Sequence, residues 1–188
     1  MILYVNACVR DGSRTRRLAE YLLNKLDGPV TEVKLEELSF PKVDQAFLDL
    51  RDGLIQRGEF GNPLFDQARQ FAAADTVVTA APYWDLSFPA LLKQYFEQIT
   101  VCGVTFSYSP EGIPQGLCRA RELYYVTTAG GPLPAQDHGY GYVKALAEGF
   151  YQIPKTKLIK AEGLDIVGAD VEAILRQAEA EIDRAFAV

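Results

Sequence analysis

The stretch "MILYVNACVRDGSRTRRLAEYLLNKL", residues 1–26, decides how the rest of the chain is interpreted. Residues 1–7 are apolar and β-branched, which is typical of a buried strand. After Arg14, apolar residues return at positions 18, 21, 22 and 26, the spacing of one buried helix face. The run Asp27-Gly28-Pro29 then ends the helix. This stretch therefore predicts a strand, a short loop and a helix.

The same pattern recurs along the chain. Residues 36–62 are expected to form a long connection with a short helix near 44–51, and residues 103–117 a small hairpin insertion. In the helix over 87–100, Ser87 is expected to cap the first turn and Pro89 to lie within it. The remaining strands are predicted at 30–35, 75–82, 122–130 and 156–164, and the remaining helices at 64–74, 142–153 and 170–188.

Strands that alternate with helices indicate an α/β fold, in which a parallel sheet is covered on both faces. Because crossover connections are right-handed, few strand orders remain, and the simplest is the flavodoxin-like order 2-1-3-4-5. We therefore expect a three-layer sandwich with a five-stranded parallel sheet. The length of 188 residues favours a single domain over 1–188.

Composition narrows the classes of partner. The formal charge of -6 argues against a nucleic-acid binder, which needs a basic surface. The three cysteines form no CxxC pair, so disulfides and a metal site are poor interpretations, and a reduced, cytoplasmic setting fits better. No apolar run approaches the ~18 residues of a membrane span.

In a sheet of this order, ligands bind beyond the carboxyl ends of the strands, so the loops at 8–15, 82–87 and 127–131 become the candidates. The first loop leads into a helix N-terminus, which favours an anion, and Ser13 and Thr15 add hydroxyl donors. Four arginines accompany them, at positions 10, 14, 16 and 17. The loop thus predicts a phosphate site, although Ser13 as a simple cap among solvated arginines remains an alternative.

The other two loops supply flat surfaces. Tyr83 and Trp84 end a buried strand and could form the wall for a planar ring, or pack into the core. Gly130 and Gly131 allow a flat ligand close to the backbone, or form a plain turn. Together, the three loops describe a pocket with an anion end and a planar end. FMN fits that pocket better than a nucleoside triphosphate because the chain has no Walker motif.

Residues 81–117, "APYWDLSFPALLKQYFEQITVCGVTFSYSPEGIPQGL", resemble the FMN-dependent NADH-azoreductases of the flavodoxin-like NAD(P)H:quinone oxidoreductase group. "VTTAGG" at 126–131 and "AEGL" at 161–164 match further segments of that family in order. The resemblance implies that the first loop contacts the FMN phosphate, that 83–86 lie along the isoalloxazine, and that 128–131 close its other side. The expected cofactor-binding residues are Arg10, Ser13, Arg14, Thr15, Pro82, Tyr83, Trp84, Asp85, Leu86, Thr128, Ala129, Gly130 and Gly131.

The family resemblance also implies an activity and an assembly. NADH or NADPH would reduce bound FMN, which would then reduce a quinone, azo compound or nitroaromatic in ping-pong fashion. A homodimer is expected, with the flavin at the interface. His138 is the candidate catalytic residue for proton transfer to the acceptor, and Tyr140 and Tyr142 are further candidates; a partly exposed loop histidine is the alternative.

Two rival functions stay open. The spacing Cys8-x5-Arg14-Thr15 resembles the nucleophilic loop of low-molecular-weight tyrosine phosphatases, in which a thiolate attacks phosphorus. Those enzymes also need an acid from an Asp-Pro motif, and no Asp in this chain precedes a Pro. An electron carrier of flavodoxin type is the second rival, but the insertion at 103–117 argues for extra walls around a substrate.

Overall fold

The computed structural model describes residues 1–135 and 137–187. Its central sheet has five parallel strands in the order β2-β1-β3-β6-β7, which confirms the predicted 2-1-3-4-5 order. Ile2 on β1 aligns with Val30 on β2 and with Thr76 on β3, so the three strands are in register at their first residues. The strands are β1 (Ile2–Asn6), β2 (Val30–Lys34), β3 (Thr76–Ala80), β6 (Glu122–Thr128) and β7 (Lys155–Ala161).

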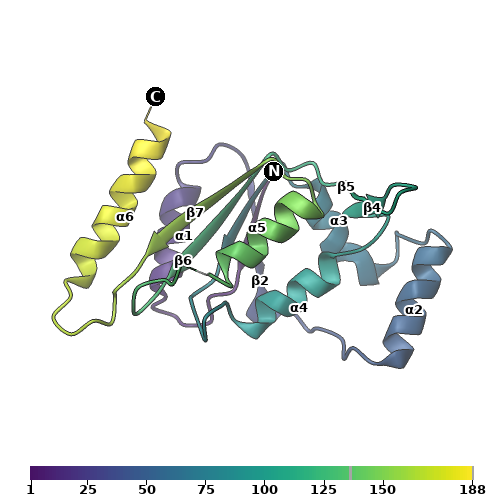
Figure 1. Ribbon diagram of the computed structural model, residues 1–188, viewed down its shortest axis with the longest axis horizontal. Coiled ribbons are helices and arrows are strands. Elements are labelled where there is room, and N and C mark those ends of the chain that lie inside the picture. The colour runs from purple at the N-terminus through teal and green to yellow at the C-terminus, as the bar shows by residue number, and fades with distance from the viewer. Residues whose placement is uncertain (136, 188) are drawn as a thin grey trace.

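Helices cover both faces of the sheet, as Figure 1 shows. On one face, α1 (Arg14–Leu23) and α6 (Val171–Phe186) pack against the strands, while α3, α4 and α5 lie on the other. The helix α2 (Gln45–Gln56) lies at the end of the molecule away from α6. The helices of the second face are α3 (Asp66–Ala73), α4 (Ala90–Ile99) and α5 (Tyr140–Gly149).

The sheet therefore separates two hydrophobic cores. Alternate residues of β1 enter different cores: Tyr4 packs on the side of α1 and α6, and Leu3 and Val5 pack on the side of α3, α4 and α5. Every residue of β1 is buried because both of its faces are covered. This explains why the first strand reads as a continuous apolar run rather than as an alternating one.

The insertion is a two-stranded antiparallel hairpin, β4 (Phe106–Tyr108) with β5 (Pro114–Gly116), as expected for 103–117. Short 3-10 turns lie at η1 (Leu35–Glu37) and η2 (Pro63–Phe65). The long connection contains more helix than predicted, since α2 starts after the cap Asp44 and continues to Gln56.

The predicted cap of α4 is wrong. The helix starts at Ala90, Pro89 precedes it as the cap residue, and no side chain caps it. Ser87 instead exchanges two backbone hydrogen bonds with Trp84, and its hydroxyl donates to the carbonyl oxygen of His138 at 3.1 Å. Ser87, which the sequence pattern assigned to the helix, therefore belongs to a tight turn before it.

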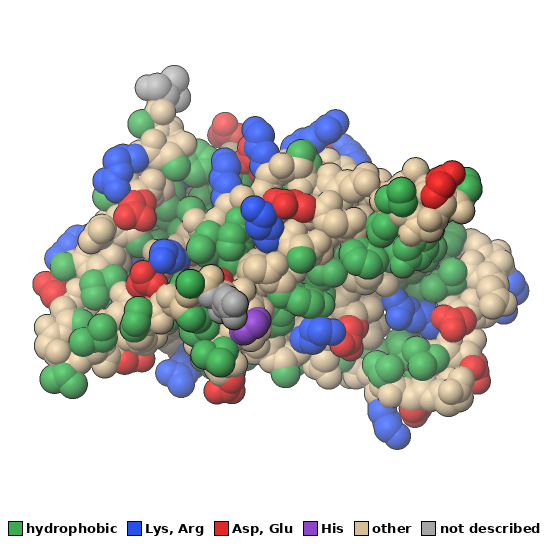
Figure 2. All heavy atoms as spheres, viewed as in Figure 1, with side chains coloured by type: hydrophobic (Ala, Val, Ile, Leu, Met, Phe, Trp, Pro, Cys, Tyr) green, Lys and Arg blue, Asp and Glu red, His purple; other side chains and the backbone are tan. Residues whose placement is uncertain are grey.

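Charged side chains of both signs are interspersed over the face that Figure 2 shows, with no extended basic region on it. None of the helices in residues 1–135 and 137–187 has the length and apolar character needed to cross a bilayer.

Candidate functional site

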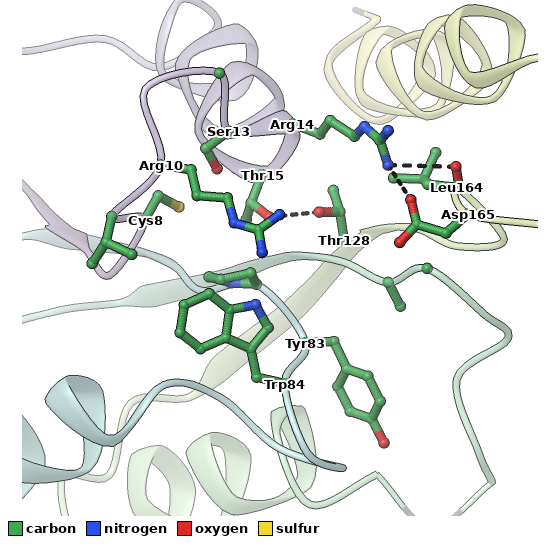
Figure 3. A pocket seen from close by; sticks show the side chains of 15 residues that line it. Cys8, Arg10, Ser13, Arg14, Thr15, Tyr83, Trp84, Thr128, Leu164 and Asp165 are labelled. Carbon is green, nitrogen blue, oxygen red and sulfur yellow. Dashed lines mark hydrogen bonds and ion pairs between the residues drawn. The ribbon is translucent and has the colours of Figure 1, made fainter.

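A cavity of about 400 Å³ lies beyond the carboxyl ends of β1, β3 and β6, where the strand order reverses (Figure 3). The position and volume are typical of ligand sites in open α/β sheets, which measure roughly 300–1,000 Å³. Loops from these three strands line it, and most of the predicted cofactor-binding residues belong to them. Those that line the cavity are Arg10, Ser13, Arg14, Thr15, Pro82, Tyr83, Trp84, Thr128, Ala129 and Gly130.

Four predicted residues do not line the cavity. Asp85 and Leu86 lie at the tip of the turn after β3, and both side chains are exposed. Gly131 is exposed one residue beyond the lining. His138 lies on an exposed loop, and its backbone carbonyl, rather than its ring, makes the hydrogen bond from Ser87. Contact of these four with a cofactor or substrate stays a prediction.

The N-terminus of α1 forms one end of the cavity. The Ser13 hydroxyl accepts from the backbone N–H of Arg16 at 3.2 Å, so it caps the helix. The N–H groups of Arg14 and Thr15 lie in the first turn and have no partner within the helix. No acidic residue occupies that turn to compete for them. This end is therefore suited to an anion.

The hydroxyls of Thr15 and Thr128 lie 2.6 Å apart, and both residues are buried. One of them donates to the other, so one hydroxyl hydrogen remains for a ligand. This contact also joins α1 to the end of β6, and the backbone N–H of Tyr83 donates to the carbonyl of Thr128 at 3.0 Å. The three loops that the sequence predicted are thus tied together around the cavity.

Two of the four arginines near the first loop are engaged elsewhere. Arg16 donates to the backbone carbonyl of Cys8 and closes the loop on itself. Arg17 pairs with Glu172 at 2.9 Å and Glu179 at 3.1 Å, which attaches α1 to α6. The four arginines do lie close together, but Arg16 holds the loop backbone and Arg17 serves the packing of α1 on α6.

The other two arginines face the cavity. Figure 3 shows the Arg10 guanidinium between Thr15 and Trp84 in that view, and Arg10 makes no ion pair with any residue in 1–135 or 137–187. Arg14 turns the other way and pairs with Asp165 at 2.8 Å. The cavity therefore offers one cation without a carboxylate partner and a second that is already paired.

The opposite end of the cavity is flat and apolar. Trp84 and Ser87 close a tight turn with backbone hydrogen bonds of 3.0 and 2.8 Å, and Asp85 and Leu86 between them have φ of 49° and 67°. Positive φ at both central positions is the requirement of a type I′ turn, where Asn and Gly are strongly preferred. A leucine there costs roughly 1–2 kcal/mol, and such strain clusters at ligand sites. The turn presents the Trp84 ring, 37% exposed, to the cavity.

A model of the flavodoxin-like fold family matches residues 1–186. The chain belongs to the flavodoxin-like fold family.

Two relatives narrow its place among flavodoxin-like proteins. The chain is 45% identical to FMN-dependent NADH:quinone oxidoreductase 2 of Clostridium acetobutylicum, over 93% of this chain and 92% of the relative. It is 34% identical to the FMN-dependent NADH:quinone oxidoreductase of Lachnoclostridium phytofermentans, over 94% and 92%. The fold is also that of an FMN-dependent NADH-azoreductase of Bacillus anthracis solved with FMN, at a TM-score of 0.81, 20% identity and coverage of 98% and 96%.

Cys8 lies at the cavity, yet its environment does not produce a thiolate. It is buried, and its sulfur donates to the carbonyl of Ala80 at 3.8 Å. Burial raises the pKa of the thiol to about 11, although a hydrogen bond with Ser13 and the charge of Arg16 act in the opposite direction. At neutral pH this flavodoxin-like protein therefore holds a neutral thiol, which is not the nucleophile that a phosphatase requires.

A fourth loop, which the sequence pattern did not predict, belongs to the flavodoxin-like site. Leu164 and Asp165, after β7, line the cavity beside Gly130. The backbone N–H of Asp165 donates to the carbonyl of Gly130 at 2.9 Å, and that of Leu164 donates to Ala129 at 3.2 Å. β7 also ends at the carboxyl edge of the sheet, so the rule that selected the other loops could have included this one.

Proposed function

We propose that the chain is an FMN-dependent oxidoreductase that passes hydride from NADH, through bound FMN, to quinones, with azo compounds and nitroaromatics as further acceptors. The relative that is 45% identical over nearly the whole chain is named an FMN-dependent NADH:quinone oxidoreductase, which supports the cofactor, the donor and the quinone acceptor. The single observation that carries the proposal is the cavity, in which a helix N-terminus with an unpaired arginine faces a tryptophan and a glycine edge. Such a cavity suits a ligand that joins a phosphate to a flat ring.

The residues present fit FMN at both ends. Ser13, Thr15 and the first-turn N–H groups of α1 would bind the phosphate, and Arg10 is the arginine of the cavity lining that has no carboxylate partner among the described residues. Trp84 would lie along the isoalloxazine, and the backbone at Ala129 and Gly130 would approach its other edge. When bound, FMN supplies the hydride chemistry, so the protein needs no acid–base dyad in the cavity.

The residues of the chain would bind the cofactor and hold the loops of the cavity in position around it. The Thr15–Thr128 contact sets the distance between α1 and the loop after β6. The turn from Trp84 to Ser87 is rigid, because two backbone hydrogen bonds close it. The nicotinamide and the quinone are both planar, and each would bind in turn at the open side of the cavity beside Trp84. Ping-pong turnover needs such a shared binding place.

His138 is proposed to assist proton transfer to the reduced acceptor. It is exposed, and its loop touches the Trp84–Ser87 turn through Ser87. Replacing His138 with Ala should leave FMN affinity unchanged and lower quinone turnover. Unchanged turnover across pH 5–9 would remove it from the mechanism.

We also infer a cytoplasmic homodimer that uses NADH in preference to NADPH. NADH is the donor in the names of the relatives. Val9, Trp84 and Leu86 leave an apolar rim around the cavity, 37%, 37% and 62% exposed, which a second copy would cover at the flavin site. Sedimentation should give twice the 20.8 kDa chain mass, and a monomer at micromolar concentration would contradict the dimer.

The decisive experiment loads the apoprotein with FMN and follows NADH and NADPH oxidation against a panel of quinones, azo dyes and nitroaromatics. Bound flavin with acceptor-dependent NADH oxidation is the expected result. Arg10→Gln should weaken FMN binding about tenfold, since a charge-assisted hydrogen bond is lost. Arg176→Gln, an exposed arginine on α6, is the matched control. A protein that binds no flavin, or that oxidises NADH without any acceptor dependence, would contradict the proposal.

A further inference from the structure

Asp165 and Arg14 form an ion pair at the wall of the cavity. The Arg14 Nη1 atom lies 2.8 Å from Oδ1 of Asp165 and 3.4 Å from the carbonyl oxygen of Leu164. Figure 3 shows the guanidinium turned toward the loop after β7 and away from Ser13 and Thr15. Arg14 belongs to the first turn of α1, so this ion pair joins the anion end of the cavity to the loop after β7.

Asp165 is attached through its backbone to the loop after β6. Its backbone N–H is bonded to the carbonyl of Gly130. Its side chain lies over Gly130 so closely that a Cβ added there would be 3.0 Å from Cγ and 3.1 Å from Cβ of Asp165. The glycine after β6 therefore makes room for the carboxylate as well as for a ligand.

The charges around the cavity show what this carboxylate opposes. Among residues 1–135 and 137–187, Asp165 is the sole acidic side chain in the lining. Arg16 and Arg17 are engaged elsewhere, so Arg10 and Arg14 are the cations available to an anion. A flavin phosphate bound at the N-terminus of α1 would be a second negative group near Arg14. The phosphate and the Asp165 carboxylate would then compete for the Arg14 guanidinium.

We propose that Asp165 competes with the flavin phosphate for Arg14 and thereby sets how strongly this site prefers FMN over riboflavin. The inference rests on the proposed function, because it names a specificity-determining residue of the same site. The ion pair is an exchangeable one, since the side chains are 41% and 70% exposed and such pairs are weak. Releasing Arg14 from Asp165 should increase the contribution of the phosphate to flavin affinity and leave the contribution of the isoalloxazine ring unchanged.

The test compares FMN and riboflavin, which differ only in the phosphate, by quenching of flavin fluorescence on the apoprotein. Asp165→Asn keeps the shape and removes the charge. We expect the ratio of the riboflavin to the FMN dissociation constant to rise about three- to fivefold, with riboflavin affinity unchanged. Asp183→Asn, which removes a carboxylate from the ion pair with Lys25 near the C-terminal end of α6, should not change the ratio.

A double-mutant cycle with Arg14→Gln shows whether Asp165 acts through Arg14. In the Arg14→Gln background, Asp165→Asn should change the ratio less than twofold. The inference is overturned if Asp165→Asn leaves the ratio unchanged or lowers it, or if it changes FMN and riboflavin affinity equally, which would mean a contact with the shared part of the flavin. A wild-type apoprotein that binds neither flavin would instead overturn the proposed function.

Discussion

At the scale of single residues, identical side chains near the first loop have different roles. Four arginines lie within eight positions of the sequence, yet Arg17 holds α6 and Arg16 holds the loop backbone. Arg10 and Arg14 alone face the cavity. Cys8, at the same cavity, is a buried neutral thiol. Proximity in sequence therefore does not tell which charges a ligand meets.

Replacing Cys8 with Ser should leave flavin binding and NADH:quinone turnover unchanged, because the proposed reaction uses no thiolate. The serine hydroxyl can still donate to the carbonyl of Ala80, so we expect a stability loss of about 1 kcal/mol. Flavin absorbance and steady-state turnover check this. Cys118→Ser, a half-buried cysteine outside the cavity lining, is the control. Loss of turnover with flavin still bound would restore a catalytic role for Cys8.

At the scale of elements, the β4–β5 hairpin packs against the segment that follows α5. Gly116 on β5 lies against the backbone carbonyl group of Tyr151, after α5, and a Cβ there would also be 2.7 Å from the side-chain Cβ of Gln152. Gln152 itself has φ of 51° and donates to the carbonyl of Pro114 at 3.1 Å. The insertion is thus attached to the connection between α5 and β7.

Replacing Gly116 with Ala should lower the free energy of unfolding by about 2–3 kcal/mol, because the new methyl group meets backbone that cannot move aside. The midpoint of urea unfolding measures this loss. Gly61→Ala is the matched control, since a Cβ at Gly61 meets nothing within 4 Å. Equal midpoints for the two variants would contradict the packing of the hairpin described above.

At the scale of the whole molecule, two cores on opposite faces of one sheet bury groups that titrate at high pH. Burial raises the pKa of Cys8 to about 11 and that of Cys118 to about 12. The folded protein therefore keeps protons that the unfolded chain releases near pH 9. Stability from these groups is complete below pH 9 and is lost as the pH rises toward the folded values.

The free energy of unfolding should accordingly fall between pH 9 and pH 11. A Cys8→Ser/Cys118→Ser variant, in which neither thiol can ionise, should fall less steeply over the same interval. Urea titrations at pH 8, 9.5 and 10.5 measure the two slopes. Parallel slopes for the variant and the wild type would show that the thiols do not carry this dependence.

The sequence alone was sufficient for the strand order, the hairpin and three of the four loops of the site, because apolar periodicity and crossover handedness are local or nearly local rules. It did not locate the start of α4. Ser87 forms two backbone hydrogen bonds with Trp84 and so belongs to a turn that precedes the helix. The single-domain interpretation stays a prediction.

Only the tertiary structure decided that Asp165 joins the site, that Arg14 is paired and Arg10 is not, and that the Cys8 thiol is neutral. These properties depend on contacts between segments as far apart as Arg14 and Asp165, and no local pattern records them.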